Sequence, residues 1–343
     1  MTKTKLRILF FSPKYYPEIG GVETHLEHIN RLLQKDYVIT VITESNNQKL
    51  PAHEHVNGVE VWRIPLQQNQ NISAKKWQIW WWLVRHFHLL LTADIIHIHD
   101  VFYWILPFYS LISWKPIYTT FHGYEAPGPL TRKQIFWHQL AAWLSWGSIC
   151  IGDFHRKWYH AKHNFVSYGG VDEISSTKKA RSNQAIFVGR LADDTGIREY
   201  LHALAFFKKP FHCDIYGDGS LKKECEKFVQ QHKLDVQFHG MVPNATAFFP
   251  AYTIIFASQY LSILQALAAG CAVIALADTP IKNDYLRMTP FEEFITIAES
   301  PKEIASAIEN FHKPSANAVK WAQQQTWEKV AALYQKLWER EEV

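Results

Sequence analysis

Main-chain amide groups at the start of a predicted helix near residue 260 could bind an anion. Apolar residues recur at helical spacing from Leu261, and Gly270 ends the helix because glycine accepts the left-handed conformation of a C-terminal cap. Two apolar runs flank this helix, and each predicts a buried strand: 252–257 and 271–276. A strand, a helix and a parallel strand place the free N–H groups of the first helical turn at the carboxyl edge of a sheet, where they bind phosphates. We therefore expect Leu261 and Ser262 to offer main-chain N–H groups and Gln265 to point into the same crevice.

A pair of glycines near the N-terminus could serve the same chemistry. Gly20 and Gly21 follow a first predicted strand and precede a helix over 22–33. Glycines let the backbone approach a diphosphate closely, and the helix N-terminus adds its dipole. An ordinary strand-to-helix turn is the alternative interpretation of a bare Gly-Gly. The position directly after the first strand favours phosphate or acceptor binding.

Histidines end two of the predicted strands in the first half. His122 follows the strand 116–121 and precedes a loop glycine, and His97 and His99 end the strand 94–99. A lone histidine is more often structural, and the chain has 18, but the carboxyl end of a strand favours a place in the site. The His-x-His spacing could suggest a metal. No convergent pair of carboxylates accompanies it, so we predict no metal site.

Length and composition predict a protein of two domains. A chain of 343 residues is long for one hydrophobic core. No stretch reaches the roughly 18 uninterrupted apolar residues that a membrane span needs, and the first residues lead directly into a strand without a signal peptide. The four cysteines lie far apart, with neither metal-ligand spacing nor a disulfide framework, which indicates the reducing cytoplasm.

Charge and tryptophan are unevenly distributed between the two halves. Residues 1–166 contain 17 Lys and Arg against 11 Asp and Glu, a net of +6, whereas residues 167–343 contain 19 against 21, a net of −2. Eleven of the 14 tryptophans lie in the first half. This difference suggests that the halves meet different partners, although each tryptophan taken singly is more often part of a core. The basic residues form no stripe, so we expect no nucleic acid among the partners.

Strands alternate with helices through both halves, and runs of β-branched residues predict parallel sheets covered on both faces. In the first half we expect strands at 5–11, 38–43, 59–64, 94–99, 116–121, 148–152 and 165–168, and helices at 22–33, 74–91, 101–113 and 131–147. In the second half we expect further strands at 185–189, 213–216 and 236–238. We expect one helix that starts at residue 196, a second that ends at residue 232, and two more at 301–311 and 326–342. The fold is thus expected to be α/β, with an N-terminal Rossmann-like domain over 1–168, a linker over 169–183, a C-terminal Rossmann-like domain over 184–325, and a last helix over 326–343 able to return to the N-terminal domain.

Several short motifs resemble those of one protein family in type and order. The most specific is Val188-Gly189-Arg190-Leu191 with Thr195-Gly196, and Thr120-Phe121-His122-Gly123 and Gln265-Ala266 accompany it. The chain resembles the retaining glycosyltransferases of the "glycosyl transferases group 1" type, also called family 4. The resemblance implies the GT-B architecture, in which two Rossmann-like domains with parallel sheets face each other across a cleft. It also implies metal-independent transfer of a sugar, with retention, from a nucleotide-diphosphate sugar to an acceptor hydroxyl, in surface polysaccharide or glycolipid synthesis. UDP or GDP is the expected nucleotide, and no further cofactor is expected.

The resemblance assigns roles to individual residues. The catalytic residues would be His122 against the transferred sugar, Arg190 on the donor diphosphate, and Gln265 in place of a glutamate that holds the ribose. The residues expected to bind the donor are Gly20, Gly21, Gly189, Arg190, Thr195, Gly196, Gly217, Met241, Val242, Leu261, Ser262 and Gln265. The residues expected to bind the acceptor are Glu23, His25 and Glu125.

The donor motif departs from the family pattern. Thr195 occupies the position of a lysine, so one positive charge is missing. Gln265 lacks the charge of the family's second glutamate, and the first glutamate has no counterpart. Two hypotheses therefore stay open: an active transferase, which the intact hydrophobic frame favours, and a nucleotide-sugar-binding subunit without useful catalysis.

Basic and aromatic residues concentrate in the predicted helix 74–91. Lys75 and Lys76 precede three consecutive tryptophans, 80–82. Tryptophan favours the membrane–water interface and lysine favours anionic headgroups, so this helix could rest on the inner leaflet and the acceptor could be lipid-linked. Adjacent residues of a helix point about 100° apart, so at least one of these tryptophans must face the core. A soluble glycan acceptor is the alternative.

Overall fold

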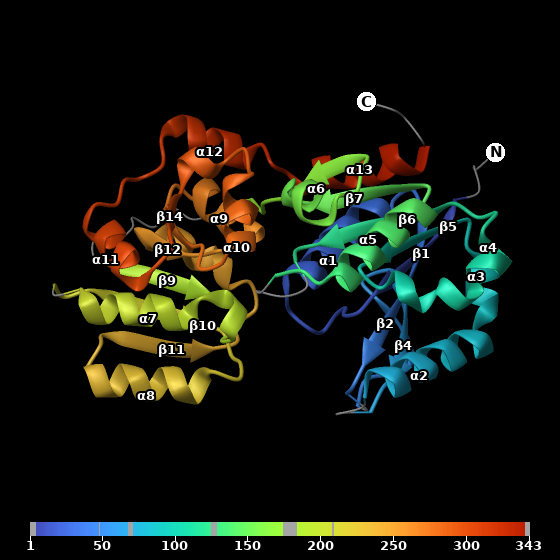
Figure 1. Ribbon diagram of the computed structural model, residues 1–343, viewed down its shortest axis with the longest axis horizontal. Helices are drawn as coiled ribbons and strands as arrows, with labels where there is room; N and C mark the ends of the chain where they lie inside the picture. Colours follow the sequence, from blue (N-terminus) through green and yellow to red (C-terminus); the bar gives the residue numbers. More distant parts are fainter. Residues whose placement is uncertain are drawn as a thin grey trace.

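The structure is a computed structural model that describes residues 5–47, 49–67, 71–124, 129–173, 184–207 and 209–339. It contains two α/β domains side by side (Figure 1). The N-terminal sheet has eight strands in the order β3-β4-β2-β1-β5-β6-β7-β8, and the C-terminal sheet has six in the order β11-β10-β9-β12-β13-β14. Among the described strands, only β3 pairs with an antiparallel neighbour, β4. The predicted pair of parallel α/β domains is therefore confirmed.

The elements of the first domain are β1 (Arg7–Ser12), α1 (Gly21–Leu33), β2 (Val38–Ser45), β3 (His53–Val56), β4 (Val59–Pro65), α2 (Ile72–Arg85), α3 (Phe87–Thr92), β5 (Ile95–His99), the 3-10 turns η1 (Phe102–Trp104) and η2 (Leu106–Phe108), α4 (Tyr109–Ile112), β6 (Ile117–His122), α5 (Arg132–Leu144), β7 (Gly147–Ile151), α6 (Phe154–Tyr159) and β8 (Phe165–Ser167). Those that follow are β9 (Gln184–Val188), η3 (Asp193–Thr195), α7 (Ile197–Phe206), β10 (His212–Tyr216), α8 (Lys222–His232), β11 (Val236–Gly240), η4 (Ala245–Ala251), β12 (Ile254–Phe256), α9 (Tyr260–Ala268), β13 (Ala272–Leu276), α10 (Pro280–Arg287), η5 (Glu292–Phe294), β14 (Thr296–Ala298), α11 (Pro301–Glu309), α12 (Ala316–Gln323) and α13 (Trp327–Glu339).

The N-terminal sheet is buried on both faces. Helices α2 to α5 and the turns η1 and η2 cover one face, in a core that contains Phe11 and Trp104. Helices α1 and α13 cover the other face, in a core that contains Phe10 and Tyr334. Because successive residues of a strand point to opposite faces, Phe10 and Phe11 of β1 enter different cores. The last helix of the chain thus completes the core of the first domain.

Apolar packing also joins the two domains. Phe154 and Tyr159 of α6 lie in one core with α9, α10 and the strands that α9 covers. On the other face of the C-terminal sheet, α7, α8 and α11 form a separate core. Gly270 follows α9 with a φ of +74°, the left-handed conformation predicted for it.

Three predicted helices end earlier or are interrupted. The helix expected over 74–91 divides at His86, whose ring bonds the carbonyl of Trp82 at 2.9 Å and so satisfies a terminal acceptor. The helix expected over 101–113 is replaced by two 3-10 turns and one turn of α-helix, with Pro107 at the start of the second turn. The helix capped by Thr131 ends at Leu144, before the strand β7.

Several short elements were not predicted. They are the edge strands β3 and β14 and the helices α6, α10 and α12. Strand β3 is half exposed, and three of its four residues are polar, so its sequence lacks the apolar run that predicts a buried strand. The N-cap of α5 behaves as expected, because Thr131 and Gln134 form a reciprocal capping box.

The packing of α13 generates a stability prediction. Trp338 is 7% exposed in the N-terminal core. We expect Trp338→Ala to lower the free energy of unfolding by about 3–5 kcal/mol, because a large buried ring leaves a cavity. Thermal unfolding followed by circular dichroism measures the loss. Trp143→Ala is the matched control, since Trp143 is 78% exposed and its removal should change stability by less than about 0.5 kcal/mol. Equal effects would contradict the packing.

Candidate functional site

The carboxyl ends of β6 and β7 meet the start of α9. Tyr124, two residues after β6, packs edge-on against Tyr285 of α10 with 5.5 Å between ring centroids. Tyr260, the first residue of α9, donates its hydroxyl proton to the carbonyl of Tyr285 at 2.6 Å. A Cβ on Gly152, directly after β7, would lie 2.5 Å from the Tyr260 hydroxyl. The predicted phosphate-binding end of α9 therefore lies against the N-terminal domain.

His122 ends β6 within a layer of histidines. Its main-chain N–H donates to Asp100 Oδ1 at 2.8 Å, and its Nε2 lies 2.8 Å from Nδ1 of His99. The ring of His25 stands edge-on to it at 5.0 Å. Burial and the neighbouring imidazoles hold the pKa values of His99 and His122 well below the ordinary histidine value. Both rings are neutral at pH 7 and act through hydrogen bonds.

A chain of hydrogen bonds links this layer to α13. The indole of Trp338, which can only donate, donates to Nδ1 of His97 at 3.0 Å. His97 then carries its proton on Nε2, which lies 2.8 Å from the hydroxyl of Thr120. Thr120 lies 3.1 Å from the hydroxyl of Tyr334, which lies 2.9 Å from Nε2 of His25. Burial lowers the pKa of His25 and of His97 to about 3. The last helix therefore sets the tautomer of His97 and orients His25.

Arg190 lies in the loop that follows β9. Its side chain is 60% exposed, and NH2 pairs with Asp194 Oδ2 at 2.7 Å. Burial raises the pKa of Glu23 in the first turn of α1, and the charge of Arg190 is among the influences that oppose this rise. An exposed ion pair contributes roughly 0–1 kcal/mol, so Arg190 can exchange Asp194 for a stronger anionic partner. Two residues predicted for the site, one from each domain, are thus within electrostatic reach.

Glycines allow the loops after β9 and β10 to touch. A Cβ on Gly217 would lie 1.8 Å from the carbonyl oxygen of Gly189, so no side chain fits there. Gly196 precedes α7 with a φ of +77°, and a Cβ would lie 2.6 Å from Leu276 Cδ2. Thr195 is buried, and its hydroxyl donates to the carbonyl of Ala192 at 2.8 Å. The hydroxyl at the family's lysine position is therefore already bonded within the loop.

Gln265 holds the start of the linker. Its Oε1 accepts the main-chain N–H of Asp172 at 2.9 Å, and its Nε2 donates to the carbonyl of Asp172 at 3.4 Å. The carboxylate of Asp172 lies 3.5 Å from Nε2 of His28 in α1, and His28 stacks on Trp327 at 4.4 Å. The amide predicted to bind a ribose thus has both groups bonded to the main chain between the domains.

The remaining predicted site residues have different surroundings. Leu261 packs against Gly169, where a Cβ would lie 2.2 Å from it, so it contacts the segment after β8. Glu125 lies outside the described residues. Five further residues predicted to bind the donor lie on loops and helix starts: Gly20, Gly21, Met241, Val242 and Ser262. Of these five, Gly21 and Met241 are exposed and the others are partly buried.

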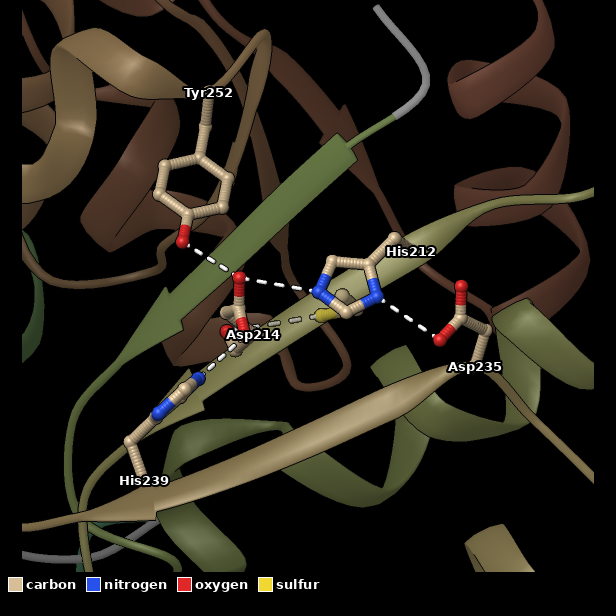
Figure 2. Close-up of polar contacts among 6 residues, drawn as sticks. His212, Asp214, Asp235, His239 and Tyr252 are labelled. Atoms are coloured by element: carbon tan, nitrogen blue, oxygen red, sulfur yellow. Dashed lines mark hydrogen bonds and ion pairs between the residues drawn. The ribbon is translucent and has the colours of Figure 1, made fainter. Parts of the chain in front are cut away.

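A polar cluster on β10 was not predicted from the sequence. Asp214 accepts hydrogen bonds from the Tyr252 hydroxyl at 2.6 Å and from Nε2 of His239 at 2.5 Å (Figure 2). Nε2 of His212 lies 3.2 Å from the same carboxylate, and its Nδ1 lies 3.0 Å from Asp235. Alternating polar residues in an otherwise apolar strand were the available signal. His239 in turn stacks on the ring of Tyr216 at 4.3 Å, at the carboxyl end of β10.

The charges of this cluster are coupled. Burial lowers the pKa of His212, but Asp235 and Asp214 more than offset this and raise it above its ordinary value. Burial raises the pKa of Asp214, but the bonds from Tyr252 and His239 and the charge of His212 lower it overall. His212 therefore contributes stability that is present below about pH 6.5 and is lost as the pH rises through its folded pKa. Asp214 contributes stability that is present above about pH 3.9 and is lost as the pH falls through its folded pKa.

Solved structures share this arrangement of two domains. Sucrose-phosphate synthase of Thermosynechococcus elongatus superposes with a TM-score of 0.77 at 15% identity, covering 98% of this chain and 99% of that chain. Anabaena HepE, solved in complex with UDP and glucose, gives 0.71 at 16% identity, with coverage of 96% and 98%. WaaG, a glycosyltransferase involved in lipopolysaccharide biosynthesis, gives 0.61 at 14% identity, with coverage of 95% and 99%. No curated protein sequence matches significantly. The fold is that of the GT-B glycosyltransferases.

Family comparison identifies the chain more closely. Residues 19–173 match Glycosyltransferase Family 4, and residues 182–313 match Glycosyl transferases group 1. The chain belongs to this glycosyltransferase family, as its motifs indicated. Among the described residues, no group of three or more His, Cys, Asp or Glu side chains could hold a metal ion. Within the same residues, no helix has both the length and the apolar character required to cross a bilayer.

The Asp214 cluster generates a pH prediction. We expect Asp214→Asn to lower the free energy of unfolding by about 1–3 kcal/mol, because Tyr252 and His239 lose a charged acceptor. The loss should be larger near pH 5.5, where His212 is protonated, than near pH 9, where it is neutral. Urea unfolding at both pH values measures it, with Asp36→Asn after α1 as an exposed control. Equal losses of unfolding free energy at the two pH values would show that the charge of His212 does not interact with Asp214.

Proposed function

We propose that this protein is a metal-independent, retaining glycosyltransferase that moves a sugar from a nucleotide-diphosphate sugar to an acceptor hydroxyl in surface polysaccharide or glycolipid synthesis. The observation that carries the proposal is the contact of the start of α9 with the carboxyl ends of β6 and β7, where Tyr124 packs on Tyr285 and a Cβ on Gly152 would meet the Tyr260 hydroxyl. UDP is the first nucleotide to test, because HepE was solved with UDP and glucose, and GDP is the second.

The chemistry depends on stabilising the leaving group. The bond between the anomeric carbon and the diphosphate oxygen breaks, a bond to the acceptor oxygen forms, and the acceptor hydroxyl loses its proton. The departing diphosphate gains negative charge. Arg190 offers five N–H donors, and Gly196, Leu261 and Ser262 offer main-chain N–H groups near helix starts. One such preorganised donor contributes roughly 3–4 kcal/mol to transition-state stabilisation.

The acceptor is proposed to bind the N-terminal domain. Glu23 and His25 lie in the first turns of α1. His122 ends β6, and its ring contacts the ring of His25. A neutral His122 can donate to or accept from a sugar hydroxyl without introducing charge. We propose a lipid-linked acceptor at the inner leaflet, with the enzyme bound peripherally from the cytoplasm.

A nucleotide-sugar-binding subunit without useful catalysis is the second candidate. It is supported by Thr195 and Gln265, because both side chains are uncharged and both already bond to main-chain groups of the protein. The two candidates differ in turnover: both bind the donor, but only the transferase releases nucleotide diphosphate as sugar is transferred or hydrolysed.

Arg190 should contribute most among the donor-site side chains. We expect Arg190→Ala to lower donor affinity or the rate of transfer at least tenfold, about 1.4 kcal/mol, because the cation facing the diphosphate is lost. Calorimetry with UDP-, GDP-, ADP- and TDP-sugars and a nucleotide-release assay measure the two quantities. Arg31→Ala on the exposed side of α1 is the control. If Arg190→Ala leaves both quantities unchanged, this motif does not bind the diphosphate.

Gln265 tests where the ribose binds. Gln265→Glu keeps an oxygen for the N–H of Asp172 and loses the donor to its carbonyl. We expect tighter nucleotide binding, because a carboxylate accepts ribose hydroxyls more strongly than an amide does. Calorimetry with the free nucleotides measures the change. An unchanged affinity for all of them, with lower thermal stability, would assign Gln265 to the linker and not to the ribose.

A further inference from the structure

Besides Ile72 at the start of α2, seven apolar side chains are more than half exposed on or shortly after three helices of the N-terminal domain. They are Trp77, Trp81 and Val84 of α2, Leu111 of α4, Trp114 shortly after it, and Phe136 and Trp143 of α5. We call these seven residues the tryptophan face. Single exposed apolar residues are ordinary, but a group of this size indicates an interaction surface.

The members of the tryptophan face project from one side of the domain. Helices α2, α4 and α5 pack their inner sides on the same face of the N-terminal sheet. Trp77 and Trp81 are one turn apart and lie opposite the buried Ile79 and Leu83. Figure 1 shows α2, α3 and α4 on the flank of this domain that is remote from the C-terminal domain. The part of the tryptophan face on and after α2 and α4 is therefore remote from the C-terminal domain, whereas α5 lies nearer the middle of the N-terminal domain (Figure 1).

The exposed tryptophans differ from their neighbours in role. The indole of Trp80 donates to the carbonyl of Tyr103 at 3.1 Å, and Trp82 stacks on His86 at 3.9 Å. Both are half-buried, which confirms that at least one of the three consecutive tryptophans faces the domain. Trp81 instead is 60% exposed, with the guanidinium of Arg85 5.3 Å from its ring centroid. Such a pair presents an apolar ring together with a positive charge, a combination that fits the hydrated, negatively charged surface of a bilayer.

The helices that carry this face contain no acidic residue. Helices α2, α3, α4 and α5 are described in full, and none includes Asp or Glu. Arg85, Arg132 and Lys133 on these helices are exposed. Lys75, by contrast, pairs with Glu44 at 2.6 Å, so its charge is already balanced. A surface of tryptophan and cations without acids is complementary to anionic lipid headgroups.

We propose that the tryptophan face docks on the surface of an anionic lipid bilayer, with its rings at the headgroup level and Arg85, Arg132 and Lys133 against the phosphates. The proposal assigns the peripheral binding of the proposed function to particular residues. This inference rests on the peripheral membrane binding included in the proposed function. It does not require that the protein transfers a sugar.

Co-sedimentation with vesicles tests the docking. We expect the protein to sediment at low salt with phosphatidylcholine vesicles containing about a third phosphatidylglycerol, and much less with phosphatidylcholine alone. Trp77→Ser, Trp81→Ser and Trp114→Ser combined should lower the affinity at least about tenfold, and so should Arg85→Glu with Lys133→Glu. All five side chains are exposed or lie outside the core, so melting curves should match the parent.

Matched controls come from the C-terminal domain. Phe206→Ser removes an exposed aromatic ring of α7, and Lys223→Glu with Lys227→Glu reverses two exposed charges of α8. Both controls should keep the parent affinity. The proposal is wrong if the parent stays in the supernatant with anionic vesicles, or if controls and face variants lose equally. It is also wrong if the face variants only dissociate an oligomer of the lipid-free parent. Calorimetry with UDP-glucose is independent: vesicle binding without donor binding would overturn the proposed function alone.

Discussion

Helix α13 buries Tyr334 and Trp338 against strands of the N-terminal sheet, and much of the structure depends on this contact. The chain reaches that position only after the whole C-terminal domain. Val171 donates its N–H to the carbonyl of Gln325 at 2.8 Å, and a Cβ on Gly170 would meet the ring of Trp327. The outgoing linker and the returning helix are therefore packed together. The N-terminal core therefore contains residues from the end of the chain, which follow the whole C-terminal domain in sequence.

The same contact determines the chemistry available beside His122. A layer of buried imidazoles would be unstable if its rings were charged, and burial keeps their pKa values low. The indole of Trp338 in α13 fixes the tautomer of His97 within this layer. In the proposed function, the positive potential for a diphosphate would come instead from Arg190 and from helix N-termini. Of the residues predicted for the site, His25 and His122 are thus neutral hydrogen-bonding groups of the N-terminal domain, and Arg190 is a cation of the C-terminal domain.

Steric contacts account for several glycines that also mark the family motif. Gly217 and Gly189 touch through their backbones, and Gly196 has a left-handed conformation. A binding subunit with this fold would need these glycines as much as an enzyme would. The positions proposed to distinguish the two candidates are therefore Arg190, which is a cation, and Thr195 and Gln265, which are uncharged where the family resemblance implies charged residues.

The sequence by itself determined the two α/β domains, nearly all buried strands, and the family to which the chain belongs, because periodicity, glycine turns and short motifs are local properties. It did not determine the break at His86 or the polar edge strand β3, where tertiary partners replace local preference. For the site, it predicted residues at strand ends and helix starts, including His122 and Arg190, and their roles stay predictions. Only the tertiary structure decided that Gln265 bonds to Asp172, that Trp338 bonds to His97, and that Trp81 is exposed beside two half-buried tryptophans. Each of these depends on which distant segments meet, and hydrogen-bond partners and exposure are fixed by that meeting and not by the residue type.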